Sequence, residues 1–254
     1  KVNIVWFKRD LRIHDNAPLH EAARVGLPII PLYVVEPDYW RQPFASRRHW
    51  NFIHDCLIEL LTDCTNLGQP LIVRVGNIVE TLNTFNTSHS IKGDYAHEES
   101  GNGWTYCRDR KVIEWCKNQS VPLYEYPSNG VVRHLASRDD WSKIRSSRMA
   151  RPHIVKPQRL VPVTSISLGD IPSKNDPIFG SFVYGITQKG GRRAAIRTLK
   201  TFFDERSKNY IYHLSAPGKS EKYCSRLSPH LTWGTLSVRE VYQSSKNHRK
   251  YFTD

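Results

Sequence analysis

The chain has 254 residues, 39% of them hydrophobic, and a formal net charge of +13 at neutral pH. No apolar run approaches the roughly 20 residues of a membrane span, and the opening residues show no signal-peptide pattern. The five cysteines are scattered and form no CxxC pair, which favours reduced thiols over a disulfide framework or a zinc site. We therefore expect a cytoplasmic protein with no membrane partner and no bound metal.

The first 126 residues alternate between short apolar runs and amphipathic stretches. Between residues 46 and 67, apolar positions recur at helical spacing and predict one buried helix face. Asp15 or Asn16 is placed to cap the helix that follows the first strand. The predicted strands are 2–7, 29–35, 71–75, 91–95 and 121–126, and the predicted helices are 16–25, 46–67, 78–85 and 106–118.

This alternation predicts parallel pairing, because right-handed crossovers return each strand to lie beside an earlier one. The fold class is therefore α/β, with a doubly wound parallel five-stranded sheet and helices on both faces, built by residues 1–127. Ligands of such sheets bind beyond the carboxyl ends of the strands. The segments 8–12, 36–39 and 96–104 follow the first, second and fourth strands and are the first places to search.

Beyond residue 127 the composition changes. Residues 128–189 are rich in Ser, Pro and basic residues, and only 139–151 forms a convincing helix. We expect them to be a long connector between domains, partly ordered by packing.

Residues 190–254 are predicted to begin an all-helical domain. Its first helix is expected over 192–206, after two glycines. A second is expected over 237–245, because Ser237 and Glu240 have the spacing of a capping box.

The positive charge lies entirely in the second half of the chain. Residues 1–126 carry 14 Lys and Arg against 15 Asp and Glu, whereas residues 127–254 carry 23 against 9. Such asymmetry indicates a polyanionic partner, with duplex DNA as the usual candidate, although a solvated basic surface gives the same pattern. The candidate contacts to DNA phosphates are Arg145, Arg148 and Arg151.

Residues 224–239 read CSRLSPHLTWGTLSVR and are the most informative part of the sequence. The hydroxyls of Ser225 and Ser228 can donate to phosphate oxygens, and Arg226 adds a fixed positive charge. From local chemistry alone, the alternative is a helix N-terminus capped by serines. We refer to residues 224–228 as the phosphate segment.

Four stretches, taken in order, resemble the photolyase/cryptochrome family of blue-light flavoproteins. They are WFKRDLRIHDN at 6–16, YAHEE at 95–99, WTYCRD at 104–109, and SRLSP at 225–229 followed by Gly234, Leu236 and Ser237. The resemblance extends over nearly the whole chain. Members of the family are usually much longer, with a large helical region after the position of Asp254. We therefore expect this chain to be the front half of such a protein.

The resemblance implies that the helical part binds FAD. The positions that match the phosphate-side residues of the family are Tyr210, Ser225, Arg226, Leu227 and Ser228. For Tyr210 the alternative is an ordinary buried aromatic. Cys224 stands where Thr is common in the family, and a thiol is a poorer hydrogen-bond donor than a hydroxyl.

The family often carries a second, light-harvesting pigment, which is methenyltetrahydrofolate, 8-hydroxy-5-deazaflavin or a flavin. Glu98 is the favoured match for a carboxylate that binds a pterin-like amide edge, with Glu99 as its competitor. Asp10, Arg12 and Tyr33 are expected to line the strand ends where a deazaflavin-type pigment would sit. The alternatives are an ion pair that fixes the first turn for Asp10 and Arg12, and solvated loop acids for Glu98 and Glu99.

The implied reaction is light-dependent repair of cyclobutane pyrimidine dimers in damaged DNA. In the family, the catalytic residues lie mostly in the helical region that would follow this chain. We therefore expect the chain, a monomer, to retain FAD weakly and to be inactive in repair on its own. The alternatives are a cryptochrome-type photoreceptor, which repairs nothing, and a stand-alone pigment-binding module.

Overall fold

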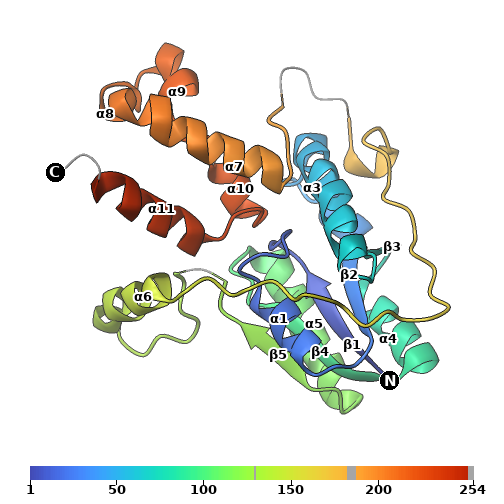
Figure 1. Cartoon of the computed structure of the whole chain (residues 1–254). Coiled ribbons are helices and arrows are strands. Elements are labelled where there is room, and N and C mark those ends of the chain that lie inside the picture. The colour runs from blue at the N-terminus through green and yellow to red at the C-terminus, as the bar shows by residue number, and fades with distance from the viewer. Residues whose placement is uncertain (129, 182–186, 251–254) are drawn as a thin grey trace.

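The computed structural model describes residues 1–128, 130–181 and 187–250. Five strands form one parallel sheet in the order β3-β2-β1-β4-β5 (Figure 1). The predicted fold class is confirmed, and the strand order reverses between β1 and β4. The strands are β1 (Val2–Phe7), β2 (Ile29–Val35), β3 (Ile72–Val75), β4 (Ile91–His97) and β5 (Leu123–Tyr126).

Helices cover both faces of the sheet and bury it completely at its centre. Alternate residues of β1 point to opposite faces, so Phe7 belongs to one apolar core and Trp6 to the other. All six residues of β1 are buried, as expected for a parallel strand between two helical layers. The first face carries α1 (Ala17–Arg24) and α3 (Arg47–Asn66), and the second carries α4 (Ile78–His89) and α5 (Gly103–Asn118).

The ends of these helices follow local capping chemistry. Asn16 caps α1, because its side-chain oxygen accepts from the Leu19 amide at 3.0 Å. Helix α5 starts three residues before the predicted position, because Asn102 and Thr105 form a capping box. The short helix α2 (Pro37–Trp40) was not predicted, since a single turn carries no periodic signal.

After β5 the chain forms α6 (Trp141–Ala150), and an extended segment then crosses the molecule on the α1 and α3 side (Figure 1). Its backbone is tied to the sheet domain at several points, among them Ile29 N to Val161 O at 3.0 Å. Near its end, Phe179 stacks on Trp50 with ring centroids 4.0 Å apart. Packing therefore orders this connector where the structure describes it.

The C-terminal helices stand beyond the carboxyl ends of the strands (Figure 1). The predicted helix 192–206 is α-helical only over α7 (Arg192–Thr201) and continues as a π-helical turn, Phe202–Arg206. The buried core of the C-terminal helices is small and consists of Ala195, Leu227 and Leu236. The further helices are α8 (Tyr210–His213), α9 (Pro217–Tyr223), α10 (Ser228–Thr232) and α11 (Val238–Lys250).

The predicted capping box at the start of α11 is confirmed. The Ser237 amide donates to a Glu240 carboxylate oxygen at 2.8 Å, and the Glu240 amide donates to the Ser237 hydroxyl at 3.0 Å. Within the described ranges, no helix is long and apolar enough to cross a membrane. The domain boundaries at residues 127 and 189 stay a prediction.

Candidate functional site

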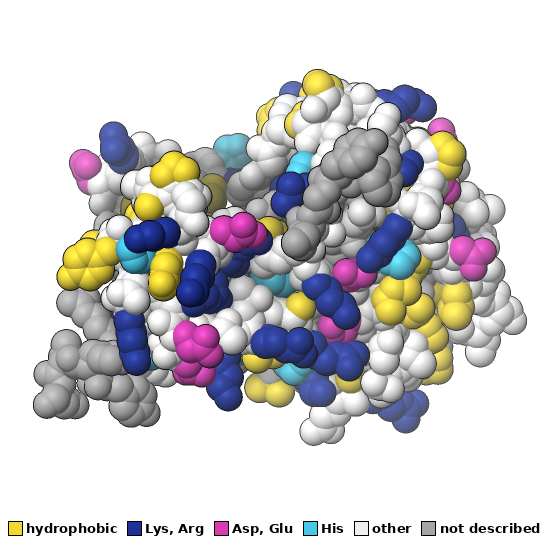
Figure 2. Space-filling model, turned by 90° about the horizontal axis from the view of Figure 1, so that it is seen from above, with side chains coloured by type: hydrophobic (Ala, Val, Ile, Leu, Met, Phe, Trp, Pro, Cys, Tyr) yellow, Lys and Arg dark blue, Asp and Glu magenta, His cyan; other side chains and the backbone are white. Residues whose placement is uncertain are grey.

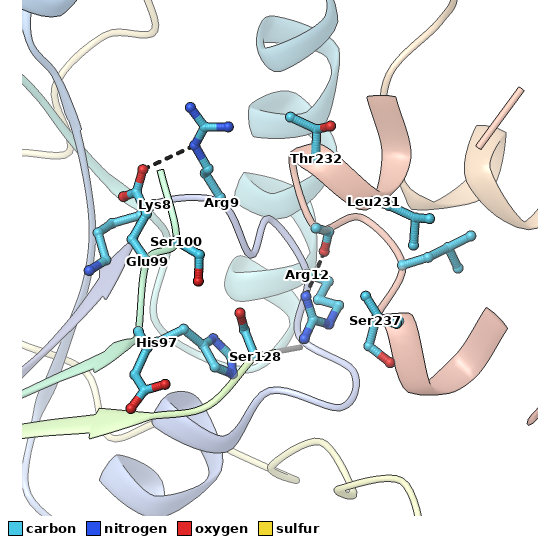
Figure 3. A pocket seen from close by; sticks show the side chains of 14 residues that line it. Lys8, Arg9, Arg12, His97, Glu99, Ser100, Ser128, Leu231, Thr232 and Ser237 are labelled. Carbon is cyan, nitrogen blue, oxygen red and sulfur yellow. Dashed lines mark hydrogen bonds and ion pairs between the residues drawn. The ribbon is translucent and has the colours of Figure 1, made fainter. Parts of the chain in front are cut away.

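A cavity of about 230 Å³ lies at the carboxyl ends of β1 and β4, where the strand order reverses (Figure 3). This is where open α/β sheets place their ligands. One wall comes from the loops after β1 and β4, and the other from the turn between α10 and α11. The lining includes Lys8, Arg9, Arg12, His97, Glu98, Glu99, Ser100, Ser128, Leu231, Thr232, Gly234, Leu236 and Ser237.

Behind His97, the Asp10 carboxylate is almost fully buried and organises the loop after β1. It accepts from the Lys8 amide at 2.8 Å, from the Asn16 side chain at 3.2 Å and from His97 Nδ1 at 2.7 Å. Burial alone would raise the pKa of Asp10, but the hydrogen bonds from His97 and from the Lys8 amide hold it below its usual value. An ionised carboxylate only accepts, so Nδ1 of His97 carries the proton and Nε2 has a free lone pair.

Burial also lowers the pKa of His97 and outweighs the opposing effect of Asp10. The imidazole is therefore neutral at neutral pH. Asp10 lies outside the cavity lining, and its partners match the alternative role of fixing the first turn. The side chain that contacts the Asp10 carboxylate is His97, however, and not Arg12 as the sequence suggested.

Arg12 joins the sheet to the C-terminal helices. Its side chain is buried and donates to the Gly234 carbonyl at 2.8 Å and to the Asp15 carbonyl at 2.9 Å. Burial lowers the pKa of Arg12, although Asp10, Glu240 and Asp15 act in the opposite direction. The guanidinium thus faces the cavity as a fixed, buried cation.

The backbone at Gly234 makes the closest approach between the two parts. Gly234 has φ +65°, and a Cβ there would lie 2.2 Å from the Arg9 carbonyl oxygen. Next to it, the Leu11 amide donates to the Trp233 carbonyl at 3.0 Å, and the Arg9 guanidinium lies 4.8 Å from the Trp233 ring. Only glycine allows this contact without strain.

On the other side of Lys8, ionic side chains pack around Arg108; we call Lys8, Glu36, Glu99, Arg108 and Asp109 the Arg108 cluster. Arg108 contacts Glu36 at 3.2 Å, Glu99 at 2.5 Å and Asp109 at 2.8 Å, and Lys8 contacts Asp109 at 3.0 Å. Burial would lower the pKa of Arg108, but these carboxylates raise it above its usual value. The cluster is a fully paired network, which rigidifies a low-dielectric site.

The two glutamates of the β4 loop differ in their partners. Glu99 is held by Arg108 and by Arg9, whose Nε lies 3.0 Å from its carboxylate. Glu98 also lines the cavity, and it has no ion pair among the described residues. Glu98 therefore has the freer carboxylate.

Tyr33 lies away from the main cavity. It is 7% exposed and lines a second space of about 40 Å³ between the Arg108 cluster and Tyr39. Pockets for drug-sized ligands usually measure about 300–1,000 Å³, so a tricyclic pigment does not fit there without rearrangement. The structure therefore brings Arg12, Glu98 and Glu99 together at one cavity and separates Tyr33 and Asp10 from it.

The phosphate segment is held by its backbone. Leu227 is buried in the small C-terminal core, and Arg226 has a positive φ of 59°. The Arg226 carbonyl accepts from Gln188 at 2.7 Å, and its guanidinium pairs with the exposed Glu221 at 3.3 Å. The hydroxyl of Ser225 lies 3.5 Å from the Leu227 amide, and Ser228 is exposed at the start of α10.

Sequence reasoning missed one basic neighbour of this segment. Arg206 donates to the Cys224 carbonyl at 2.5 Å and to the Thr198 carbonyl at 2.6 Å. Tyr210 lies in α8, half-buried, with its ring edge-on to Phe202 at 5.5 Å. In the sequence, only its positive charge could have indicated Arg206 as a neighbour of the phosphate segment, and many residues in the second half of the chain share that charge.

The three arginines proposed for DNA differ in their surroundings. Arg145 lies over the rings of Trp141 and Tyr242, at 5.7 and 5.5 Å. Arg148 donates to the Val131 carbonyl at 2.6 Å, whereas Arg151 is exposed just after α6. Seen from above the C-terminal helices, Lys and Arg side chains gather over the middle of the face, with fewer Asp and Glu among them (Figure 2).

Comparison with known proteins agrees with this arrangement. The sequence model of the family described as DNA photolyase matches residues 3–143, more than half of the chain. The protein therefore belongs to the DNA photolyase family, as its motifs predicted.

Individual relatives are distant and longer. Cryptochrome DASH from Synechocystis sp. is 25% identical over 275 residues, which cover 97% of this chain and 55% of the relative. A bacterial class III photolyase from Agrobacterium tumefaciens superimposes with TM-score 0.79 and 21% identity, over 98% of this chain and 53% of that structure. An archaeal photolyase from Sulfolobus tokodaii, solved with two FAD molecules, gives TM-score 0.72 and 21% identity, over 99% and 56%. The chain spans about half the length of the relatives it matches.

Proposed function

We propose that this chain provides the pigment-binding domain and the FAD-phosphate segment of a blue-light photolyase that repairs cyclobutane pyrimidine dimers. The observation that carries the proposal is the direct junction between the two sites. Arg12 lines the cavity at the sheet and donates to Gly234, six residues after the phosphate segment. A pigment in the cavity and a cofactor at the segment would therefore be held in a fixed relative position.

The phosphate segment suits the pyrophosphate of FAD by its chemistry. Ser225 and Ser228 offer hydroxyl donors, and Arg226 and Arg206 place two guanidiniums near the same backbone. Leu227 would anchor the segment in the core, and Tyr210 would donate its phenol or pack beside the cofactor. Bound FAD would supply light-driven electron transfer, while these residues would only bind and orient it.

The cavity suits an antenna pigment with a polar edge. Glu98 offers a carboxylate acceptor that makes no ion pair with the described residues, and the Ser100 and Ser128 hydroxyls add donors. The opposite wall, with Leu231 and Leu236, is apolar enough to pack a ring. A volume of about 230 Å³ is close to the lower end of ligand pockets, so part of a larger pigment would extend into solvent.

DNA would contact the basic second half through phosphates, without reading sequence. Arg151, exposed after α6, is the best placed of the three arginines; Arg145 and Arg148 already have intramolecular partners. Binding to duplex DNA should weaken steeply with salt. The affinities for a duplex that contains a pyrimidine dimer and for the same undamaged duplex should differ little, because in the family the residues that bind the lesion lie mostly in a later helical region that these 254 residues do not include.

The FAD part of the proposal is tested by fluorescence titration. FAD should bind weakly to the chain, and Arg226→Gln should weaken binding further, whereas Arg138→Gln, an exposed arginine outside the segment, should not. FAD binding that is unaffected by Arg226→Gln would mean that the phosphate segment does not bind FAD. Blue-light repair of dimer-containing DNA by this chain alone would overturn its predicted inactivity.

A cryptochrome-type photoreceptor is the second candidate, and the similarity to cryptochrome DASH favours it. Both functions need the same pigment cavity and phosphate segment. They differ in DNA repair, which a photoreceptor lacks. Blue-light repair of dimer-containing DNA separates them, because only a photolyase carries it out.

A further inference from the structure

A second, smaller pocket adjoins the main cavity on its β5 side. It measures about 30 Å³ and shares Arg12, His97 and Ser128 with the larger cavity. Four arginines from separate parts of the chain line it, and we call it the arginine pocket. They are Arg12 after β1, Arg148 in α6, Arg151 just after α6, and Arg239 in α11.

Positive charge in the arginine pocket is poorly compensated. Asp15 is the one carboxylate among the described lining residues, and it accepts from Arg239 at 3.1 Å and from the Ile154 amide at 2.9 Å. The nearby Asp10 and Glu240 are engaged by His97 and Arg192. Four arginine residues and one acidic residue thus line the part of the pocket that the structure describes.

Two of these guanidiniums also hold donors for which the described residues provide no acceptor. The Nε atoms of Arg12 and Arg239 are buried and have no hydrogen-bond partner among the described residues. The Arg12 residue is only 3% exposed, and its two terminal nitrogens are already used by the carbonyls of Gly234 and Asp15. Buried unpaired donors are costly and rare in native proteins. Two such donors on the arginines of one pocket indicate that a ligand with hydrogen-bond acceptor atoms binds there.

We propose that the arginine pocket binds the phosphate group of a small ligand, either inorganic phosphate or a phosphate monoester whose remainder lies in the adjoining cavity. Guanidinium groups match phosphate oxygens with paired, charge-assisted hydrogen bonds. The Ser128 hydroxyl can donate as well, and the neutral His97 can accept from a protonated phosphate oxygen.

The size of the pocket favours a single oxyanion over a nucleic-acid backbone. A water molecule needs about 10–15 Å³ of such space, so 30 Å³ has room for two or three water-sized positions and not for a sugar-phosphate chain. The other oxygens of a phosphate would extend into the adjoining cavity, which shares Arg12, His97 and Ser128 with the pocket. The Arg12 guanidinium at its inner wall is also buried, beyond the reach of a phosphate that stays in the outer surface of a duplex.

Calorimetric titration of the 254-residue chain with inorganic phosphate, against chloride at equal ionic strength, tests the proposal without FAD, pigment or light. We expect saturable binding of one phosphate and no such binding of chloride. Arg151→Gln should weaken phosphate binding at least about tenfold, and Arg12→Lys, which keeps the charge but removes Nε, should also weaken it. Arg159→Gln removes an exposed arginine of the same connector outside the pocket and should leave binding unchanged.

Riboflavin and its 5′-phosphate distinguish the two ligand sources. If the ligand is a monoester that fills both spaces, the phosphorylated flavin binds more tightly than riboflavin and competes with inorganic phosphate. If the ligand is free phosphate, riboflavin and its 5′-phosphate bind equally tightly, and inorganic phosphate still binds saturably.

Three results would overturn the proposal: phosphate that binds no better than chloride, an equal loss of binding in Arg159→Gln, or binding of duplex DNA, sensitive to Arg151→Gln, with none of phosphate. Circular dichroism of each variant separates loss of the site from loss of the fold. Because neither FAD nor pigment is needed, failure here leaves the proposed function untouched.

Discussion

The carboxyl edge of the sheet and the phosphate segment are both candidate ligand sites, but they are built differently. The sheet edge rests on two large apolar cores and the fully paired Arg108 cluster. The phosphate segment rests on a core of three buried residues, Ala195, Leu227 and Leu236. Helix α8 of the same region leaves the apolar side chain of Ile211 85% exposed. The first region is therefore organised without a ligand. The second depends on its contacts with the first, through Arg12 and Gly234.

The largest expected effect is the loss of Arg108. Arg108→Met leaves Glu36, Glu99 and Asp109 buried without their shared cation, and removing one partner of a buried network costs about 3–5 kcal/mol. Urea denaturation followed by circular dichroism measures this. Arg110→Met, on the exposed side of the same helix, should change the free energy of unfolding by at most about 0.5 kcal/mol. Equal losses in both variants would mean that the cluster does not stabilise the sheet edge.

A second effect concerns Asp94, a fully buried carboxylate of β4 with no partner for either oxygen in the described part of the structure. Burial raises its pKa to about 7, although Lys8 partly opposes this. The usual pKa of Asp is about 3.9, so the folded state binds the proton more tightly than the unfolded state. The free energy of unfolding therefore falls as pH rises from about 4 to about 7.

Asp94→Asn removes this pH dependence. The variant should be more stable than the wild type above pH 7, by on the order of 4 kcal/mol, and similar to it at about pH 4. Denaturation at several pH values measures both, with the exposed Asp139→Asn as the control. A variant that is less stable at every pH would show that Asp94 is ionised and paired.

The junction between the regions is tested at Gly234. Gly234→Ala forces a side chain against the Arg9 carbonyl at a positive φ and should cost about 1–3 kcal/mol. Hydrogen exchange should show loss of protection in α10 and α11 while β1 stays protected. Gly218→Ala in α9 places its Cβ in open space and should have no such effect. Loss of protection in β1 as well would mean that the sheet edge depends on the junction.

The smallest effect is expected at the start of α11. Ser237→Ala removes the hydroxyl that accepts from the Glu240 amide and should cost about 1 kcal/mol. Thermal unfolding measures the loss, and Ser245→Ala on the exposed part of the same helix serves as the control. A Ser237→Ala variant as stable as the control would mean that the cap does not hold α11.

Strands, long helices and caps could be predicted from the sequence, because each depends on neighbouring residues. Apolar runs gave all five strands, and the Ser237 capping box was visible from spacing alone. The short helices α8 to α10 were missed, because four to seven residues are too few for a periodic pattern.

The site was predicted less completely, because its contacts join residues far apart in the chain. Asp10 and His97 are 87 positions apart and Arg9 and Glu99 are 90 apart, and no local pattern pairs them. Asp10 was therefore placed among the lining residues, whereas the structure puts it behind His97. The arginine pocket draws on four separate segments and was not visible from the sequence.

The proposed function depends above all on a light-harvesting pigment in the cavity at the sheet edge. The most direct measurement is the near-ultraviolet and visible absorption spectrum of the chain, purified in dim light and incubated with folate and flavin pigments, followed by release and identification of what is bound. We expect a stoichiometric pigment band that is lost in Glu98→Gln and kept in Glu114→Gln on α5. A protein that stays colourless with every pigment would contradict it.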